Sequence, residues 1–309
     1  MEIMLDKVCI HTFLTPGFMG WGELFLEALR RVHGERIHVR VDSRDLSDEQ
    51  IALLHDIYGN IEVHNQPMDW EGLVKNANVP LETLHQWRVE IERGIPTAEN
   101  HLWRIAISVN ERYCSLPQVT EELRAQGYEM VLHSDADIYI RRPLDQMFEI
   151  ISNHDVCVYI RPNNPHRLAV VGGFLGFRLT DQTQTFLARW MKHIDAVKFI
   201  DRWKGFGQST LWYAIQESDD ISIADLRVEP GAPRLSKLFE PEVELWLGNA
   251  KVEGPIKVVS IRRCWEDLQS RYPRIKLPER TLGERIHSEI KAAWMWLKNV
   301  IRNLISKKP

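Results

Sequence analysis

The chain has 309 residues, of which 44% are hydrophobic and 27% charged, so it is long enough for one large soluble α/β domain or two small ones. A formal net charge of −4 argues against nucleic acid as the main partner. The four cysteines are widely spaced and show no zinc-binding pattern. Scattered cysteines of this kind are expected to stay reduced, as they would in the cytoplasm.

The first segment of the chain, residues 1–14, carries acidic residues near its start and has no long apolar run. We therefore expect neither a signal peptide nor a membrane span there, and we expect a cytoplasmic protein. The glycine-containing loop 15–22 that follows lacks the Lys-Ser/Thr of a P-loop and the G-x-G-x-x-G of a dinucleotide site.

Strands and helices alternate in the first part of the chain. Residue patterns predict strands at Val8–Phe13, Arg36–Val41 and Ile61–His64, separated by helices at Glu23–Val32 and Asp48–Tyr58. Such alternation predicts an α/β fold with a mostly parallel sheet, in which ligands gather at the carboxyl ends of the strands. Residues 70–127 are then rich in helix formers, with prolines marking the breaks.

The segment Tyr128–Pro143 (YEMVLHSDADIYIRRP) is the centre of the functional prediction. Its apolar residues predict a buried strand that ends in Asp135 and Asp137. If the strand stays extended through Asp137, its period of two places His133 and both acids on one face. Two close carboxylates repel each other unless a cation lies between them, and Mn²⁺ or Mg²⁺ prefers such oxygen ligands. The structural alternative is an Asp-rich turn at a strand end.

The second half of the chain continues the α/β pattern. We expect helices at Pro143–Ile151, Asp181–His193 and Ser209–Glu217. We expect strands at Asp155–Ile160, Ala169–Arg178, Ile221–Ala224 and Ile256–Ile261. Gly172 and Gly173 interrupt the strand Ala169–Arg178, and such a pair marks either a β-bulge or a place where a ligand approaches the backbone.

The C-terminal segment Glu284–Ile305 is predicted to be an amphipathic helix with basic residues along one flank. It either docks against its own domain or lies on an anionic membrane surface, which would make the protein membrane-peripheral. We expect one domain over residues 1–275, followed by this helix and a tail over 276–309.

Three stretches, in this order, resemble the GT-A nucleotide-diphospho-sugar transferases. The first is the Asp135-Ala136-Asp137 motif between a hydrophobic strand and Pro143-Leu144, the second is Val171–Phe177 (VGGFLGF), and the third is Gly207–Leu211 (GQSTL). The resemblance covers mainly Trp103–Leu211 and is closest to families that retain the anomeric configuration. It implies a GT-A-like Rossmann-type sheet flanked by helices.

The resemblance also implies roles for the acids and for the later motifs. Asp135 and Asp137 would hold Mn²⁺ or Mg²⁺ against the donor diphosphate, and Gly172 and Gly173 would line the donor-sugar pocket. The amide of Gln208 would lie near the reacting sugar carbon.

For three further residues the resemblance implies weaker assignments. Thr12 and Phe13 would lie against the nucleotide base, although a strand-end threonine and a core phenylalanine explain them equally well. Arg104 would face the diphosphate, where a guanidinium binds phosphate oxygens well, but most helical arginines are solvated. Two positions depart from the family: Gly207 replaces an aspartate, and Ser260–Arg263 stands where relatives carry a histidine metal ligand.

The expected function is metal-dependent transfer of a hexosyl or pentosyl group from a nucleotide-diphosphate donor to a glycan or other hydroxyl acceptor. UDP is the nucleotide that the resemblance favours, with retention of configuration. One alternative is a catalytically silent GT-A module that binds glycan or nucleotide, and another is a metal-dependent nucleotidylyltransferase. The second alternative lacks its expected Gly-rich, Lys-bearing loop near the first strand.

Overall fold

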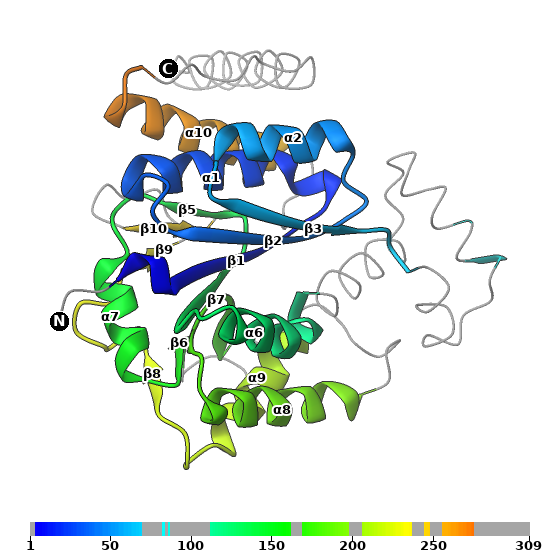
Figure 1. Ribbon diagram of the computed structural model, residues 1–309, viewed down its shortest axis with the longest axis vertical. Helices are drawn as coiled ribbons and strands as arrows, with labels where there is room; N and C mark the ends of the chain where they lie inside the picture. Colours follow the sequence, from blue (N-terminus) through cyan, green and yellow to red (C-terminus); the bar gives the residue numbers. More distant parts are fainter. Residues whose placement is uncertain are drawn as a thin grey trace, which may run out of the picture.

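The structure, a computed structural model, describes residues 4–69, 82–83, 86, 112–161, 169–197, 206–236, 244–247 and 255–274. Arg104 and the predicted C-terminal helix Glu284–Ile305 lie outside these ranges. Within them the chain forms three layers, with a central sheet between two layers of helices (Figure 1).

The central sheet has seven strands within the described residues, in the order β3-β2-β1-β4-β7-β6-β8. Most pairs are parallel, but β7 runs antiparallel to both β4 and β6. The strands are β1 (Val8–Leu14), β2 (His38–Arg44), β3 (Ile61–Gln66), β4 (Met130–Ser134), β6 (Val156–Ile160), β7 (Val170–Arg178) and β8 (Ile223–Asp225). The predicted α/β class with a mostly parallel sheet is confirmed.

Helices cover both faces of this sheet (Figure 1). On one face lie α1 (Met19–His33), α2 (Asp48–Ile57), α7 (Asp145–Asn153) and α10 (Pro255–Arg271), and on the other lie α6 (Leu116–Ala125), α8 (Asp181–Asp195) and α9 (Phe206–Gln216). Short 3₁₀ turns at Leu5–Lys7 and Pro16–Phe18 precede β1 and α1. Among the described helices, none is long and apolar enough to cross a membrane.

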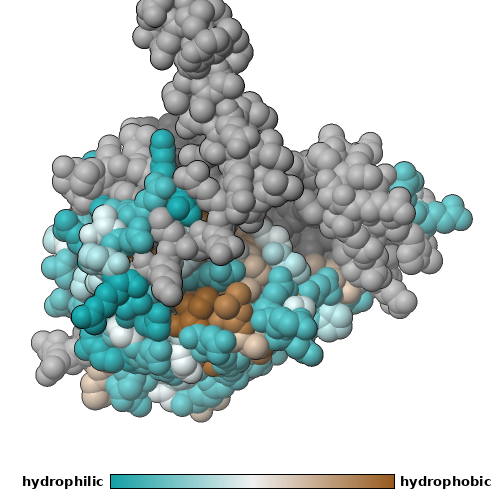
Figure 2. Space-filling model, turned by 90° about the horizontal axis from the view of Figure 1, so that it is seen from above, coloured by the Kyte–Doolittle hydropathy of each residue, from teal (hydrophilic) through white to brown (hydrophobic). Residues whose placement is uncertain are grey.

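The alternation of side chains along each strand creates two hydrophobic cores. Ile10 and Leu132 point to the α1 side, whereas Cys9 and Val131 point to the α6 side. Helix ends are fixed locally: Ser47 begins α2 with a capping box to Gln50. Seen from the side of α2 and α10, the described surface is largely hydrophilic around one hydrophobic patch (Figure 2).

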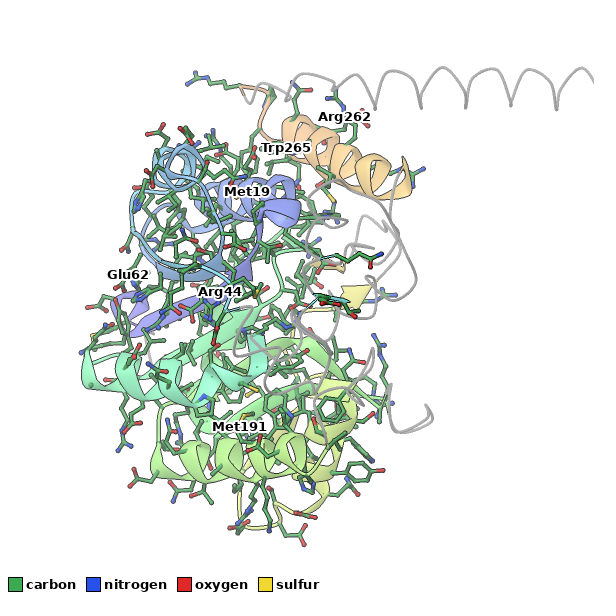
Figure 3. The ribbon with its side chains drawn as sticks, turned by 90° about the vertical axis from the view of Figure 1, so that its right-hand side faces the viewer. Met19, Arg44, Glu62, Met191, Arg262 and Trp265 are labelled. Carbon is green, nitrogen blue, oxygen red and sulfur yellow. The ribbon has the colours of Figure 1, made fainter. Side chains whose placement is uncertain are left out.

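The prediction of a strand at Ile256–Ile261 is wrong, because these residues form the start of α10. Proline is well tolerated in the first helical turn, and Pro255 begins this helix. Farther along, Cys264, Trp265 and Leu268 are buried at helical spacing. Trp265 lies beside Met19 of α1, which shows how α10 packs against α1 (Figure 3). The helical period therefore outweighs the strand-like run of β-branched residues.

The strand that carries the acids also differs from the prediction, because β4 ends at Ser134, before both aspartates. The chain turns at Asp135, where the Ile138 N–H donates to the Asp135 carbonyl oxygen at 3.0 Å. It then enters β5 (Ile138–Ile140), which belongs to a small second sheet with β9 (Leu235–Ser236) and β10 (Leu245–Leu247). The extended geometry through Asp137 is thus wrong, and the acids occupy the turn between two sheets.

Candidate active site

The position of Asp135 is fixed from two directions. Its backbone N–H donates to the carbonyl oxygen of Gly173 at 2.7 Å, which continues the antiparallel pairing of β4 with β7 beyond Ser134 and Phe174. Its side chain is 21% exposed, so Asp135 is partly accessible to solvent at the carboxyl end of β4. Asp137, two residues on, is 8% exposed. The acidic turn therefore lies where β4 leaves the sheet.

The glycine pair of β7 contacts this turn and a second group of side chains. A Cβ added to Gly173 would lie 2.7 Å from the Asp135 Cγ, closer than real Cβ contacts allow. A Cβ added to Gly172 would lie 3.2 Å from Cζ of Tyr113 and 3.4 Å from Cγ of Gln208. The structure thus brings Asp135, both glycines and Gln208 together, although they come from three separate motifs.

The glycine pair also lies in an irregular part of the β6–β7 ladder. Val158 pairs with Leu175, but Ile160 pairs with Val170, so the register shifts between these two pairs. Gly172 and Gly173 fall within this shift, as expected for a bulge. The structure thus supports the bulge, and the approach of a ligand to this backbone stays a prediction.

Gln208 lies in the first turn of α9, which the structure describes from Phe206 onward, rather than in a loop before the helix. Its side chain is half-buried, while the preceding Gly207 is buried. The Cγ methylene of Gln208 is the part of this side chain that lies next to Gly172 of β7.

Arg112 and Tyr113, just before α6, complete the cluster, and the sequence prediction missed both. The Arg112 guanidinium donates through Nη1 to Asp135 Oδ1 and through Nη2 to the Tyr113 hydroxyl. Its carbon Cζ lies 4.2 Å from the centre of the Tyr113 ring, a cation–π contact. The neighbouring Arg88, Arg93, Arg104 and Arg124 have the same residue type, so nothing in the sequence singled out Arg112.

Burial and charge set the protonation of this pair. Burial raises the pKa of Tyr113 to about 12 against the opposing effect of Arg112, so the tyrosine stays a neutral hydroxyl. Burial alone would lower the pKa of Arg112, but Asp135, Tyr113 and Asp137 together raise it. The guanidinium is therefore a permanent cation that both acids of the turn stabilise.

A buried polar network lies beside this cluster, also outside the sequence prediction. His11 of β1 and His133 of β4 are fully buried, with their Nδ1 atoms 3.0 Å apart, and His11 Nε2 lies 3.4 Å from Asp42 Oδ2. Burial lowers the pKa of His133 well below 6.5, helped by His11 and Arg112, so this imidazole is neutral. Its ring meets the edge of Tyr113, with centroids 6.2 Å apart.

Of the other predicted residues, Thr12 and Phe13 belong to β1, whereas Arg104 lies outside the described residues. Thr12 and Phe13 are at the carboxyl end of β1, but they are only 1% and 9% exposed and so offer little surface to a base. Arg44 lies over the Phe13 ring, 5.8 Å from its centre. Arg262 is part of α10, where its Nε donates to Glu266 Oε1 at 3.2 Å, so it is held within that helix.

The acidic turn fits an open divalent-cation site in its donor chemistry. Among the described residues, no three His, Cys, Asp or Glu side chains gather as metal ligands. Mg²⁺ and Mn²⁺ need only one or two carboxylates when waters and substrate phosphates supply the rest. Asp135 and Asp137 provide two hard oxygen donors, and the closeness of Gly173 leaves Asp135 unshielded by any side chain at that position.

Among the solved structures that this chain resembles are glycosyltransferases. The galactosyltransferase LgtC, in complex with donor and acceptor sugar analogs, superposes with a TM-score of 0.53 at 13% identity, over 88% of this chain and 98% of that one. An active-site mutant of LgtC also superposes with a TM-score of 0.53, at 13% identity, over 89% and 99% of the two chains. The chain has the GT-A fold.

A further solved structure, the glycosyltransferase GlyE of Streptococcus pneumoniae TIGR4, superposes less closely, with a TM-score of 0.44 at 11% identity over 71% of this chain and 46% of that one. No protein-family model and no curated protein sequence matches the chain. At these low identities the comparisons establish the fold, and the function is inferred from the residues of the site.

Proposed function

We propose that the protein is a metal-dependent glycosyltransferase that moves a sugar from a nucleotide-diphosphate donor to a hydroxyl acceptor, with retention of configuration. One observation carries the proposal: four segments far apart in sequence meet at the glycine pair of β7. They contribute Asp135 itself, Gly172 with Gly173, Gln208, and Arg112 with Tyr113. A purely structural turn needs neither a glycine that accommodates the carboxylate nor a paired arginine.

The acidic turn supplies the site for the diphosphate. Asp135 and Asp137 would hold Mn²⁺ or Mg²⁺, and the bound cation would neutralise the charge that builds on the departing diphosphate. Arg112, which pairs with Asp135, would be a basic residue beside this site, and Arg104, outside the described residues, stays a candidate for the same contact. Its planar guanidinium suits two-point contact with phosphate oxygens.

The other residues of the cluster would place the sugar. Gly172 and Gly173 would line the donor-sugar pocket, and the amide of Gln208, whose Cγ lies near Gly172, would support the reacting sugar. Tyr113 holds the Arg112 guanidinium through its ring and its hydroxyl. We include Thr12 and Phe13 as weaker candidates for contact with the nucleotide base.

For the wider setting, we propose a UDP-sugar as donor, a glycan or other hydroxyl compound as acceptor, and a cytoplasmic location. The predicted C-terminal helix, outside the described residues, would add peripheral membrane contact.

The test is donor hydrolysis. The protein is incubated with UDP- and GDP-sugars and Mn²⁺, and we expect slow release of a nucleoside diphosphate in the absence of acceptor. Asp137→Asn should lower this rate by about 10²-fold or more, since it weakens the stabilisation of the leaving group. Asp219→Asn, which changes an exposed aspartate after α9, is the matched control and should leave the rate unchanged. Pyrophosphate release instead would indicate a nucleotidylyltransferase.

A second candidate, a binding module without catalysis, is favoured by Gly207 at the position where relatives carry aspartate. In that case nucleotide sugars would raise the melting temperature with Mn²⁺ present, because a ligand of the folded state stabilises it, but no donor would be hydrolysed. Stabilisation without turnover across the full donor panel would replace the enzyme proposal with this one.

A further inference from the structure

The Arg112–Asp135 ion pair places a protein cation where the proposed function needs a metal cation. The guanidinium donates to Asp135 Oδ1, and Asp137 also acts on it electrostatically. Both carboxylates of the turn thus share one positive charge that belongs to the chain. Because two like-charged carboxylates at close range are unfavourable without a cation, Arg112 stabilises the turn in the absence of any ligand.

The same guanidinium is incompletely satisfied. Its Nε is buried and has no hydrogen-bond partner among the described residues. A buried N–H without an acceptor is costly, and an arginine that is fully used would engage this donor as well. Tyr113 holds the guanidinium by its ring and hydroxyl, so the group keeps its place even when its bond to Asp135 is broken. An anion beside Arg112 would complete its donors.

We propose that Arg112 is the internal counter-ion of the acidic turn and that it gives up Asp135 to a divalent cation, after which its guanidinium binds the donor diphosphate. This inference rests on the metal-dependent transfer proposed above. It has a thermodynamic consequence: cation and donor bind cooperatively. The cation competes with Arg112 for Asp135, and the diphosphate offers the displaced guanidinium a new partner, so each ligand strengthens the binding of the other.

The sign of one measurement separates this role from a structural one. Without nucleotide, Arg112→Gln removes the competitor, and Mn²⁺ should bind about tenfold more tightly, because a neighbouring positive charge no longer opposes it. If Arg112 merely held the site in shape, the same variant would bind Mn²⁺ more weakly. Arg112→Lys keeps the charge and should stay close to the wild-type affinity.

Cooperativity gives the second readout. In the wild type, UDP should tighten Mn²⁺ binding by a factor in the usual coupling range of about 5–150, and Arg112→Gln should reduce this factor toward one. Both affinities are measured by electron paramagnetic resonance of free Mn²⁺ and checked by titration calorimetry. Arg124→Gln is the matched control, since Arg124 of α6 pairs with Asp181 on the surface. It should change neither affinity.

The outcomes separate the two proposals. If the wild type binds Mn²⁺ and Arg112→Gln binds it no more tightly, the exchange is refuted while the proposed function stands. If neither protein binds Mn²⁺ with or without UDP, the metal-dependent function itself fails, and the exchange fails with it. Should Arg112→Gln not fold, the comparison uses Arg112→Lys: a UDP effect equal to wild type with unchanged Mn²⁺ affinity supports the charge-based exchange, and a weaker Mn²⁺ affinity overturns it.

Discussion

Replacing Gly173 by alanine tests the packing at the centre of the site most directly. The new Cβ would lie 2.7 Å from the Asp135 Cγ and 3.3 Å from its Cβ, so the carboxylate must move away from β7. Because the Asp135 side chain is partly exposed, it can move aside to make room for the new methyl group. The loss in the free energy of unfolding should therefore be at the low end for overpacking, about 1 kcal/mol. We expect Tm to fall by roughly 2–4 °C.

The effect on function should be much larger than this loss of stability. A displaced Asp135 loses its geometry toward Arg112 and toward a bound cation, and displacement of a catalytic group by about 1 Å lowers rates by about 10²-fold. We therefore expect donor hydrolysis per folded molecule to fall by about 10²-fold in Gly173→Ala, with Mn²⁺ affinity lowered as well. The assays are donor hydrolysis, Mn²⁺ titration and thermal unfolding.

Gly176→Ala, in the same strand, is the matched control, because it should lower stability more than Gly173→Ala does and leave the activity of folded molecules unchanged. Its Cβ would lie 2.8 Å from Ile151 Cδ1 and 3.1 Å from Cys157 Cβ, inside the fully buried core rather than at the site. Overpacking there should cost about 2–3 kcal/mol while the activity of folded molecules is kept. If the two variants lose activity in proportion to their loss of Tm, the reasoning about Gly173 and Asp135 is refuted.

Three further predictions concern Gln208 in the site and two polar groups, Asp267 and His33, on the α1 side of the sheet. Gln208→Ala should lower kcat by about 10²-fold and change the donor KM only a few-fold if the amide acts on the reacting sugar, and an unchanged kcat would exclude that role. Asp267→Asn should lower the free energy of unfolding by about 2–3 kcal/mol in urea titrations, because Asp267 of α10 accepts hydrogen bonds from both Arg141 and Arg271 at a mostly buried site. Burial lowers the pKa of His33 from 6.5 to about 4, so the folded protein binds fewer protons than the unfolded chain, and stability is complete above pH 6.5 and falls as the pH drops toward 4. His33→Gln should remove up to about 3 kcal/mol of that pH dependence, and parallel stability curves for the two proteins would contradict it.

The sequence was sufficient for elements whose pattern is local. The strands β1, β2 and β3 and the helix α2 follow directly from alternating apolar residues and from the Ser47 to Gln50 capping pattern. The same logic failed at Ile256–Ile261, where β-branched residues favoured a strand. There the decisive information lay farther along the chain, in buried residues such as Trp265 and Leu268 that a helix brings onto one face.

The structure brings residues of the three predicted motifs together, but their contacts could not be read from the sequence. Asp135 meets Gly173 because β4 and β7 pair antiparallel, with Ser134 opposite Phe174, and this register depends on the whole sheet. Arg112, just before α6, donates to Asp135. The positions of the arginines along the chain do not reveal which of them makes this contact. His11 and His133 each looked like one polar residue in an apolar strand, and only the parallel register of β1 with β4 makes them partners.

The choice of residue at Gly172 and Gly173 shows why the cluster is more than a turn. A bulge in β7 by itself would accept many residue types, since the backbone there does not adopt a left-handed conformation that favours glycine. What excludes a side chain at these positions is the space taken by Asp135 on one side and by Tyr113 and Gln208 on the other. The glycines are therefore required by the polar side chains that pack against β7, and not by the conformation of the strand itself. The glycosyltransferase function proposed above gives these glycines a reason, because a bound donor would use the groups that they accommodate.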